Sequence, residues 1–322
     1  MRYLITQTRK DAIGIVQQNL LKRLNYKQIN IKWFKFMPLS HLWELVYTFL
    51  FSFRLKATDI VLSCNSKSIH THILPHLTKA KLFQIHYHFD DKRLFKLHHL
   101  SCFSYEKLFS QWHTIFTNTH MKELAVAGLG CKNWSVVPLG IDHEMFQDYG
   151  LTREPNTLLY VGSFGHRKNI TRTIQAFSNI LKVVPTAQLT ICNGGSGSYQ
   201  DIELQLNTLG IQDKVNYLKD VSLVRLVTEY NKAEVFVFPT LIEGFGLPLV
   251  EATACGCRVV TSNLPVHREV TCNKETYVDP LKVNAIAEGM IKALKRKGNN
   301  KEVSHKFNWN RMATDVLEIT ND

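Results

Sequence analysis

The strongest constraint on the fold is a regular alternation of short apolar segments with amphipathic helical segments along residues 156–262. The segment NTLLYVGSF (156–164) begins with an almost unbroken apolar run, which is typical of a strand buried on both faces of a parallel sheet. The next segment, residues 169–184, repeats apolar side chains at helical spacing and stops at Pro185. Because the two patterns continue to alternate, the sequence predicts a parallel, doubly wound α/β sheet with right-handed crossovers.

The first half of the chain follows the same rhythm. Strands are predicted at residues 1–6, 59–64, 81–89 and 114–118, and an amphipathic helix follows the first of them. The chain has 322 residues, whereas a single hydrophobic core tends to stop growing near ~250–300 residues. We therefore expect two Rossmann-like domains facing a central cleft, joined near the loop-rich segment 137–157.

Composition and cysteine usage favour a globular protein of a reducing compartment. Hydrophobic residues make up 45% of the chain and charged residues 20%, as in ordinary folded domains. The longest apolar stretch, residues 36–55, is interrupted by Pro38, His41 and Glu44, which favours a packed helix over an interfacial helix or a membrane span. No signal-peptide pattern opens the sequence, and the seven cysteines contain no CxxC pair. A cytoplasmic location is the resulting expectation.

The net charge of +12 is spread unevenly. Residues 1–150 hold 19 Lys and Arg against 10 Asp and Glu, and residues 151–322 hold 20 against 17. The first half therefore carries most of the positive field, which would attract an anionic partner such as acidic lipid, a phosphorylated substrate or nucleic acid. A basic surface that is merely solvated accounts for the same numbers.

Three loops follow predicted strands of the second half, where ligands of doubly wound sheets bind. The first, VGSFGHRKN (161–169), presents Arg167 and Lys168 beside the start of a helix, and this pair is either a diphosphate site or a solvated basic pair. The second, CNGGSGSY (192–199), contains Gly194, which either lets a ligand approach the backbone or makes a tight turn.

The third loop, PTLIEGFGLPLVEATACG (239–256), carries two glutamates. Glu243 precedes a Gly-Phe-Gly turn, and Glu251 lies on the helix that Pro248 is expected to begin. The glycines can let backbone N–H groups approach an anion, and the helix dipole adds to that attraction. Two acids at separate depths suit two sets of hydroxyl groups on one extended ligand.

In order and spacing, these three loops resemble the retaining glycosyltransferases of the GT-B fold, in the large family (family four) that includes sucrose synthase and bacterial mannosyltransferases. The E-x7-E pattern with its inner G-F-G-x-P is the most specific signal. The resemblance implies an acceptor-binding domain at residues 1–145 and a nucleotide-sugar-binding domain at 146–306. It also implies that a helix in residues 307–322 crosses back to the first domain.

The resemblance also implies roles for individual residues. Glu243 would hold donor-sugar hydroxyls or stabilise charge at the anomeric carbon, and Glu251 would bind the ribose hydroxyls. Arg167 and Lys168 would neutralise the diphosphate leaving group, so neither a metal nor another cofactor is expected. The remaining donor-binding residues would be Gly14, Gly162, Ser163, Asn169, Gly194, Lys219, Gly244, Phe245, Gly246 and Leu247. Ser163 and Lys219 depart from the family, which often has arginine and glycine at these two places.

The segment QIHYHFDD (84–91) resembles the family strand that ends in a histidine facing the donor sugar. His86 is the chosen catalytic residue, and His88 is its competitor. A structural role is open, and so is a zinc site built either from His86, His88 and Asp90 or from the histidines at positions 70, 72 and 76. Because eleven of the fourteen histidines lie in residues 1–150, such proximity also arises by chance.

Together these patterns predict an enzyme, a retaining hexosyltransferase that moves a sugar from a nucleotide-diphosphate donor to a glycan, lipid-linked or phosphorylated acceptor. The GHRKN form of the first loop resembles that of mannosyl- and rhamnosyltransferases, and this resemblance slightly favours GDP-mannose as the donor. Peripheral contact with the inner face of an anionic membrane is a further expectation. The alternatives are a non-catalytic glycosyltransferase-like partner subunit and a basic nucleic-acid-binding protein. No helix-turn-helix, RNA-recognition or zinc-finger pattern supports the latter.

Overall fold

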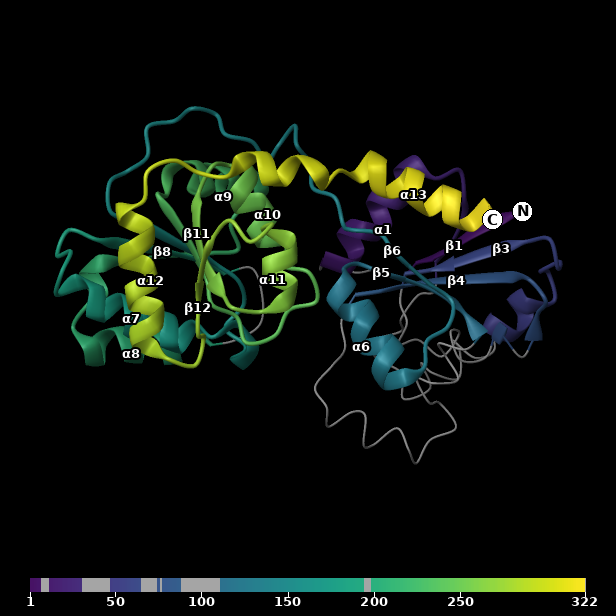
Figure 1. The fold of residues 1–322 in the computed structure, drawn as a ribbon, viewed down its shortest axis with the longest axis horizontal. Helices are drawn as coiled ribbons and strands as arrows, with labels where there is room; N and C mark the ends of the chain where they lie inside the picture. The colour runs from purple at the N-terminus through teal and green to yellow at the C-terminus, as the bar shows by residue number, and fades with distance from the viewer. Residues whose placement is uncertain are drawn as a thin grey trace. The chain divides into compact units, whose positions relative to one another are not determined.

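The computed structural model of the protein describes residues 1–6, 12–30, 47–64, 74–75, 77–87, 111–193 and 198–321. The chain forms two compact units. One consists of Met1–Gly140 together with Trp309–Asp322, and the other of Ile141–Asn308 (Figure 1). The expected class, α/β with two Rossmann-like doubly wound units, is confirmed.

The second unit is built on a parallel sheet with the strand order β12-β11-β10-β7-β8-β9. Its strands are β7 (Thr157–Val161), β8 (Gln188–Asn193), β9 (Val215–Lys219), β10 (Val235–Phe238), β11 (Arg258–Ser262) and β12 (Thr276–Val278). The chain adds β8 and β9 on one side of β7 and the later strands on the other side. The strand order therefore reverses between β7 and β10, and sheets of this kind bind ligands at the carboxyl ends beside such a reversal.

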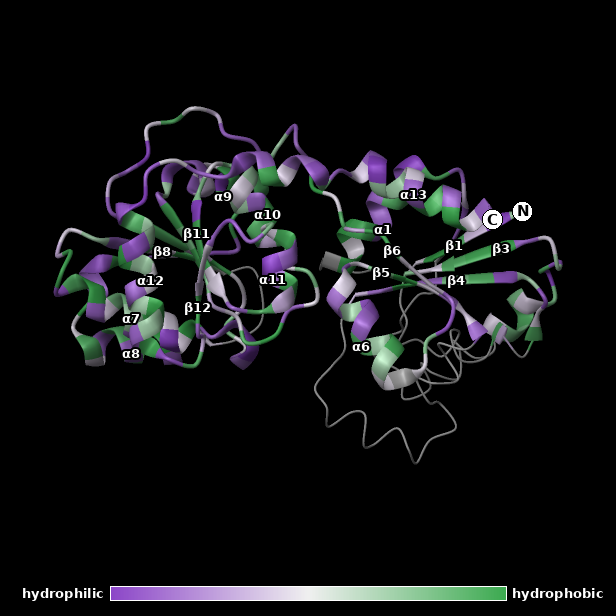
Figure 2. Cartoon of the chain, viewed as in Figure 1, coloured by the Kyte–Doolittle hydropathy of each residue, from purple (hydrophilic) through white to green (hydrophobic). Residues whose placement is uncertain are grey.

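Helices cover this sheet because each turns an apolar face toward it. They are α7 (Ile170–Leu181), α8 (Tyr199–Leu209), α9 (Leu223–Lys232), α10 (Leu247–Ala254), α11 (Pro265–Val270) and α12 (Val283–Lys295). Ile174 and Phe177 of α7 and Met290 of α12 are fully buried in one core with the strands. Figure 2 shows the hydrophobic strands between helices whose outer faces are hydrophilic.

The first unit has its own parallel sheet, with the order β2-β1-β3-β4-β5-β6. Its strands are β1 (Arg2–Thr6), β2 (Lys27–Asn30), β3 (Ile60–Ser63), β4 (Lys81–His86), β5 (His113–Phe116) and β6 (Trp134–Val136). Its helices include α1 (Ala12–Arg23), α6 (Thr119–Leu129) and the last helix of the chain, α13 (Trp309–Asn321).

Helix α13 belongs to the first unit although it ends the sequence. Its Thr320 hydroxyl lies 2.7 Å from the hydroxyl of Tyr26, and both side chains are buried. Arg23 of α1 donates to the side-chain oxygen of Asn310 at 2.6 Å. Helix α13 therefore packs against residues from the beginning of the chain.

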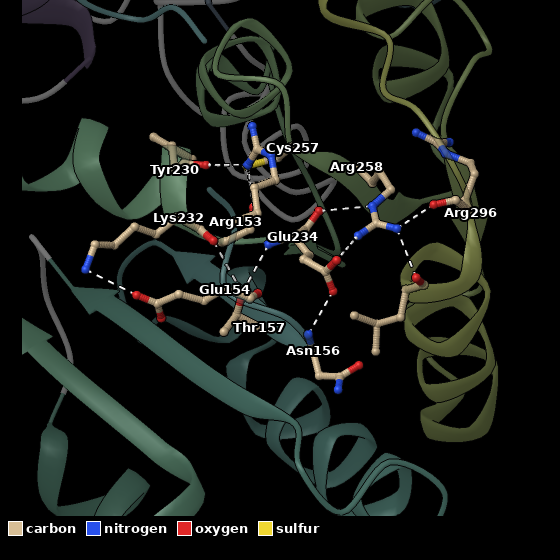
Figure 3. A network of polar contacts seen from close by, with 12 residues as sticks. Arg153, Glu154, Asn156, Thr157, Tyr230, Lys232, Glu234, Cys257, Arg258 and Arg296 are labelled. Carbon is tan, nitrogen blue, oxygen red and sulfur yellow. Dashed lines mark hydrogen bonds and ion pairs between the residues drawn. The ribbon is translucent and has the colours of Figure 1, made fainter. Parts of the chain in front are cut away.

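A network of charged and amide groups closes the amino edge of the second sheet (Figure 3). Arg258, the first residue of β11, pairs with Glu234 at 2.9 Å and also donates to the carbonyl oxygens of Leu294 and Arg296. The second carboxylate oxygen of Glu234 accepts from the backbone N–H of Asn156 at 2.8 Å. We call Asn156, Glu234 and Arg258 the amino-edge network; it joins the chain just before β7 and β10 to the start of β11.

Several elements depart from the expectations. The predictions lack strands β2, β6 and β12 and helices α6, α11 and α12, and Gly14 lies within the first turn of α1 rather than in a loop. Of the predicted helix at 36–55, residues 47–52 are helical, and 36–46 lie outside the described residues. In the described part of the chain, no helix is both long and apolar enough to cross a membrane.

Candidate functional site

The loop after β7 is shaped by Tyr160, the fourth residue of that strand. Its buried hydroxyl donates to the backbone carbonyls of Ser163 and Lys168, at 3.1 and 3.3 Å, and so folds residues 162–168 back over the end of the strand. A Cβ atom at Gly162 would lie 3.2 Å from this hydroxyl, a tight contact that glycine avoids. The predicted glycine at this position therefore serves the shape of the loop.

Asn169 joins this loop to helix α7 from a left-handed conformation, with φ of 58°. Its side-chain N–H groups donate to the carbonyls of Pro239 (2.9 Å) and Pro280 (2.7 Å), and its side-chain oxygen accepts from Arg172. Each of these bonds is internal to the unit. Asn169 therefore hydrogen-bonds the loop after β7 to the segment that follows β10.

Three charged residues meet where these two loops converge, and we call them the Glu243 cluster. One carboxylate oxygen of Glu243, Oε1, accepts from Lys168 Nζ at 2.5 Å and from Arg167 at 3.0 Å. The side chains of Lys168 and Glu243 are 11% and 10% exposed, whereas that of Arg167 is 55% exposed. The backbone N–H of Leu241 also donates to the carbonyl of Arg167 at 2.8 Å. The cluster is a buried ion pair with a second cation at its open side.

The electrostatics of the cluster leave one positive charge in excess. Burial lowers the pKa of the Lys168 ammonium, and the nearby Arg167 lowers it further, while the Glu243 carboxylate raises it. The ammonium also lies 4.8 Å from the ring centroid of Phe238, which favours its charged form. Two cations facing one carboxylate can attract a further anion, because that anion would complete the charge balance.

Glu251 occupies a separate position on helix α10. Its Oε2 accepts from the hydroxyl of Tyr230 on α9 at 3.1 Å, and burial raises the pKa of its carboxyl to about 7. The hydrogen bond from Tyr230 opposes that rise, since it favours the ionised form. A carboxyl group with a pKa near 7 ionises around neutral pH, and the ionised carboxylate accepts hydrogen bonds from hydroxyl groups.

The turn between the two glutamates begins α10. Gly246 has a φ of 91°, a region that favours glycine, and it forms the N-cap of the helix with Pro248 in the first turn. Phe245 is buried with its ring edge-on to Phe307 at 5.5 Å, and Leu247 is also buried. Phe245 and Leu247 therefore anchor the turn by their side chains and could offer a ligand only their backbone groups.

Gly244 belongs to the same turn, between Glu243 and Phe245. The other predicted residues lie elsewhere. Lys219 ends β9 and is exposed. His86 ends β4 in the first unit, where it is buried with its ring edge-on to Phe116 at 5.9 Å. Gly194 lies outside the described residues, as do His88, Asp90 and the histidines at positions 70, 72 and 76. Among the residues that are described, no group of three or more His, Cys, Asp or Glu is placed to hold a metal ion.

Sequence reasoning missed two buried residues of this region. Tyr230 holds Glu251 from a different helix, and His267 of α11 lies beneath the loop that carries Glu243. Apolar spacing marks Tyr230 as a core position, and its bond to a carboxylate 21 residues away has no local signal. His267 stands in the segment PVHREV, which carries no recognisable site pattern.

Residues 142–310, more than half of the chain, match the family described as Glycosyl transferases group 1. The chain belongs to this family. The match covers almost the whole second unit, including the Glu243 cluster and Glu251. The resemblance to the GT-B glycosyltransferases that the three loops predicted is thereby confirmed.

Curated relatives agree with this membership. The chain is 34% identical over 137 residues to the O-antigen chain mannosyltransferase B of Escherichia coli, covering 42% of this chain and 36% of the relative. It is 35% identical over 126 residues to the O-antigen chain mannosyltransferase RfbU of Salmonella typhimurium, covering 39% and 35%. The match thus spans about a third of the length of these relatives.

The fold itself is shared over nearly the full chain. The sucrose-phosphate synthase of Thermosynechococcus elongatus superposes with a TM-score of 0.80 at 17% identity, over 99% of this chain and 98% of the other. At this identity the likeness establishes the fold, which is GT-B.

Proposed function

We propose that the protein is a retaining glycosyltransferase that uses a nucleotide-diphosphate sugar, with mannose as the favoured sugar. The observation that carries this proposal is the Glu243 cluster at the carboxyl edge of β7 and β10, in a chain of this family. The preference for mannose rests on the GHRKN loop and on the printed names of the relatives, among them a phosphatidyl-myo-inositol mannosyltransferase.

Arg167 and Lys168 are assigned to the diphosphate. Each keeps N–H donors beyond the one directed at Glu243, and the excess positive charge of the cluster suits a leaving group that gains negative charge. Fixed cations at this place can stabilise the departing nucleoside diphosphate without a metal ion. In the proposed same-face reaction, the acceptor hydroxyl attacks the anomeric carbon, the sugar–phosphate bond breaks, and the leaving phosphate oxygen takes the acceptor proton.

The two glutamates would mark the two ends of the donor. Glu243, held by Lys168, is assigned to the sugar hydroxyls or to the positive charge at the anomeric carbon. Glu251, held by Tyr230, is assigned to the ribose hydroxyls. The backbone around Gly244, Phe245 and Gly246 would meet the phosphates between them. His86 is assigned to the sugar from the first unit.

A lipid-linked acceptor at an anionic membrane is supported by one surface of the first unit. The described helical residues 47–52 and the turn after them expose Leu50 (59%) and Phe53 (73%), and Phe53 packs edge-on with Phe49 at 4.8 Å. The exposed Arg54 follows directly. Aromatic side chains next to basic ones are suited to the boundary of an anionic bilayer. Co-sedimentation with phosphatidylglycerol vesicles should fall in Phe53→Ser, and equal sedimentation would refute this assignment.

Thermal stabilisation by a panel of nucleotide sugars, including GDP-mannose and UDP-glucose, tests the donor proposal. One of them should raise the melting temperature of the wild type, and Lys168→Ala should lose most of that rise. Lys232→Ala is the matched control, because Lys232 pairs with Glu154 at the opposite edge of the same sheet. No stabilisation of the wild type by any nucleotide sugar would overturn the proposal, in favour of a non-catalytic or nucleic-acid-binding protein.

A further inference from the structure

His267 is a fully buried histidine that the proposed reaction does not use. It lies at the carboxyl ends of β10 and β11 among three other fully buried polar residues, Thr240, Thr261 and Ser262. Burying four polar side chains together is costly unless each finds a partner. The contacts of His267 therefore indicate what this arrangement maintains.

The hydrogen bonds of the neighbouring threonines determine which ring nitrogen of His267 carries the proton. Thr261 donates its hydroxyl proton to the carbonyl of Phe238 at 3.0 Å, so its oxygen accepts from His267 Nδ1, which lies 2.8 Å away. With the proton on Nδ1, the other ring nitrogen, Nε2, carries a lone pair. That lone pair faces the hydroxyl of Thr240 at 3.5 Å, a long hydrogen bond.

The ring lies beside both ends of the loop that carries Glu243. Thr240 stands at the beginning of this loop, and Ser262 donates to its carbonyl at 2.5 Å. Gly246 stands at the end, where a Cβ atom would lie 3.8 Å from the Cδ2 atom of His267. Glu243 lies midway between these two points. A single rigid side chain thus supports the loop from below on both sides.

The electrostatic setting keeps the ring neutral. Burial and the nearby Lys168 together lower the pKa of His267 to about 4, although Glu243 and a hydrogen bond with the Ser262 backbone oppose this shift. The neutral ring retains both a donor and an acceptor, which a protonated ring would not.

We infer that His267 is a positioning residue, which holds the loop of residues 240–246 so that Glu243 meets Lys168 at the reacting end of the donor. This inference rests on the proposed function and deepens it. His267 reaches no substrate atom in this role and acts only through the loop. The rate of sugar transfer should depend on it more than the binding of the nucleotide does, because the Lys168 backbone is held by Tyr160 and the Glu251 carboxylate by Tyr230, and neither tyrosine belongs to this loop.

Steady-state kinetics with GDP-mannose as the probe, together with hydrogen exchange of the 241–247 amides, test the inference. His267→Leu keeps the volume but removes the hydrogen bonds of the ring, and it should lower kcat ~10- to 100-fold with KM for the nucleotide sugar within ~2-fold. His267→Asn can still donate to Thr261 and should retain kcat within ~3-fold. Exchange of the loop amides should accelerate in the leucine variant and not in the asparagine variant.

Two further variants are needed: Thr240→Val as a second test of the loop contact and Thr320→Val as a control. Thr240→Val removes the partner of Nε2 and should lower kcat without unfolding the protein, so the test survives if His267→Leu fails to fold. Thr320→Val removes a buried hydroxyl of the first unit and is the matched control, with kcat unchanged. Wild-type kcat and wild-type loop exchange in both His267→Leu and Thr240→Val would refute the positioning role. Lack of turnover by the wild type with every nucleotide sugar would instead refute the proposed function, while the exchange measurement would still decide whether His267 holds the loop.

Discussion

The two edges of the second unit's sheet use similar residues for different purposes. At the amino edge, Arg258 is 12% exposed and divides its donors between Glu234 and backbone carbonyls, so its charge and its hydrogen bonds are used within the fold (Figure 3). At the carboxyl edge, Glu243 is the one carboxylate that pairs with Lys168 and Arg167 among the described residues, and Arg167 stays half exposed. A balanced network stabilises the fold, whereas a cluster with surplus charge can bind an anionic ligand.

Removing the Lys168 ammonium is the most direct test of the different roles that we give to the two edges of the sheet. Lys168→Met should lower sugar transfer ~100- to 1,000-fold, the usual loss when a group that stabilises the charge of the transition state is deleted. It should cost little stability, because Arg167 continues to pair with Glu243. Turnover of GDP-mannose and chemical denaturation measure the two effects. A large loss of stability with retained turnover would reverse the roles given to the two edges.

Arg258→Met tests the opposite edge. It leaves Glu234 without its cation and three carbonyl contacts without their donor, and we expect a loss of ~3 kcal/mol in the free energy of unfolding. Turnover per folded molecule should stay at the wild-type level. Urea denaturation, paired with an assay of the soluble fraction, checks this. A selective loss of turnover would show that the amino-edge network also serves the site.

The raised pKa of Glu251 predicts a pH dependence. Ribose hydroxyls donate to the ionised carboxylate, so the affinity for a nucleotide sugar should increase ~3- to 10-fold as the pH rises through about 7. In the unliganded protein, the stability that Glu251 contributes changes with pH in the opposite direction. Since the folded state keeps a proton that the unfolded chain releases above its ordinary pKa of 4.5, this group's contribution to stability falls as the pH rises from there to about 7.

Titration calorimetry across this pH range measures the affinity, and Glu251→Gln is the matched variant because it cannot ionise. Its affinity should be independent of pH between 6 and 8. If the wild type and the variant show the same slope, the assignment of Glu251 to the ribose is wrong.

The smallest expected effect concerns Tyr230. Tyr230→Phe removes one buried hydrogen bond and should cost ~1 kcal/mol of stability. It should also move the midpoint of the pH-dependent affinity upward, because the ionised form of Glu251 loses a donor. An unchanged midpoint would mean that Tyr230 does not hold the carboxylate in the ligand-bound protein.

Much of the fold could be predicted because burial follows local periodicity. Strands β7 (157–161) and β10 (235–238) lie inside the sheet, and their apolar runs reflect cover on both faces. The missed strands β2, β6 and β12 are edge strands of three or four residues, and polar residues interrupt the apolar run that marks an inner strand. Helix α12 buries Ile286, Met290 and Ala293 at helical spacing, so the sequence does carry the signal for this helix.

In the candidate site, too, the sequence indicates the role of some residues and not of others. The sequence pointed to Arg167, Lys168 and Glu243 because charged residues directly after buried strands are typical of ligand sites. For Asn169 it suggested a ligand contact, whereas the structure shows hydrogen bonds to Pro239 and Pro280 within the fold. Spacing along the chain cannot distinguish these two uses of a polar side chain, since both occur in the same loops.

The sequence by itself determined that the chain forms parallel α/β sheets and that two glutamates flank a glycine turn before a helix. Only the tertiary structure decided which charges meet. Glu243 bonds to Lys168 across 75 residues, Tyr230 reaches Glu251 from another helix, and His267 lies under the loop between them. The physical reason is that periodicity records which face of an element is buried. The partners of a side chain depend on where the strand order reverses and which loops that reversal brings together.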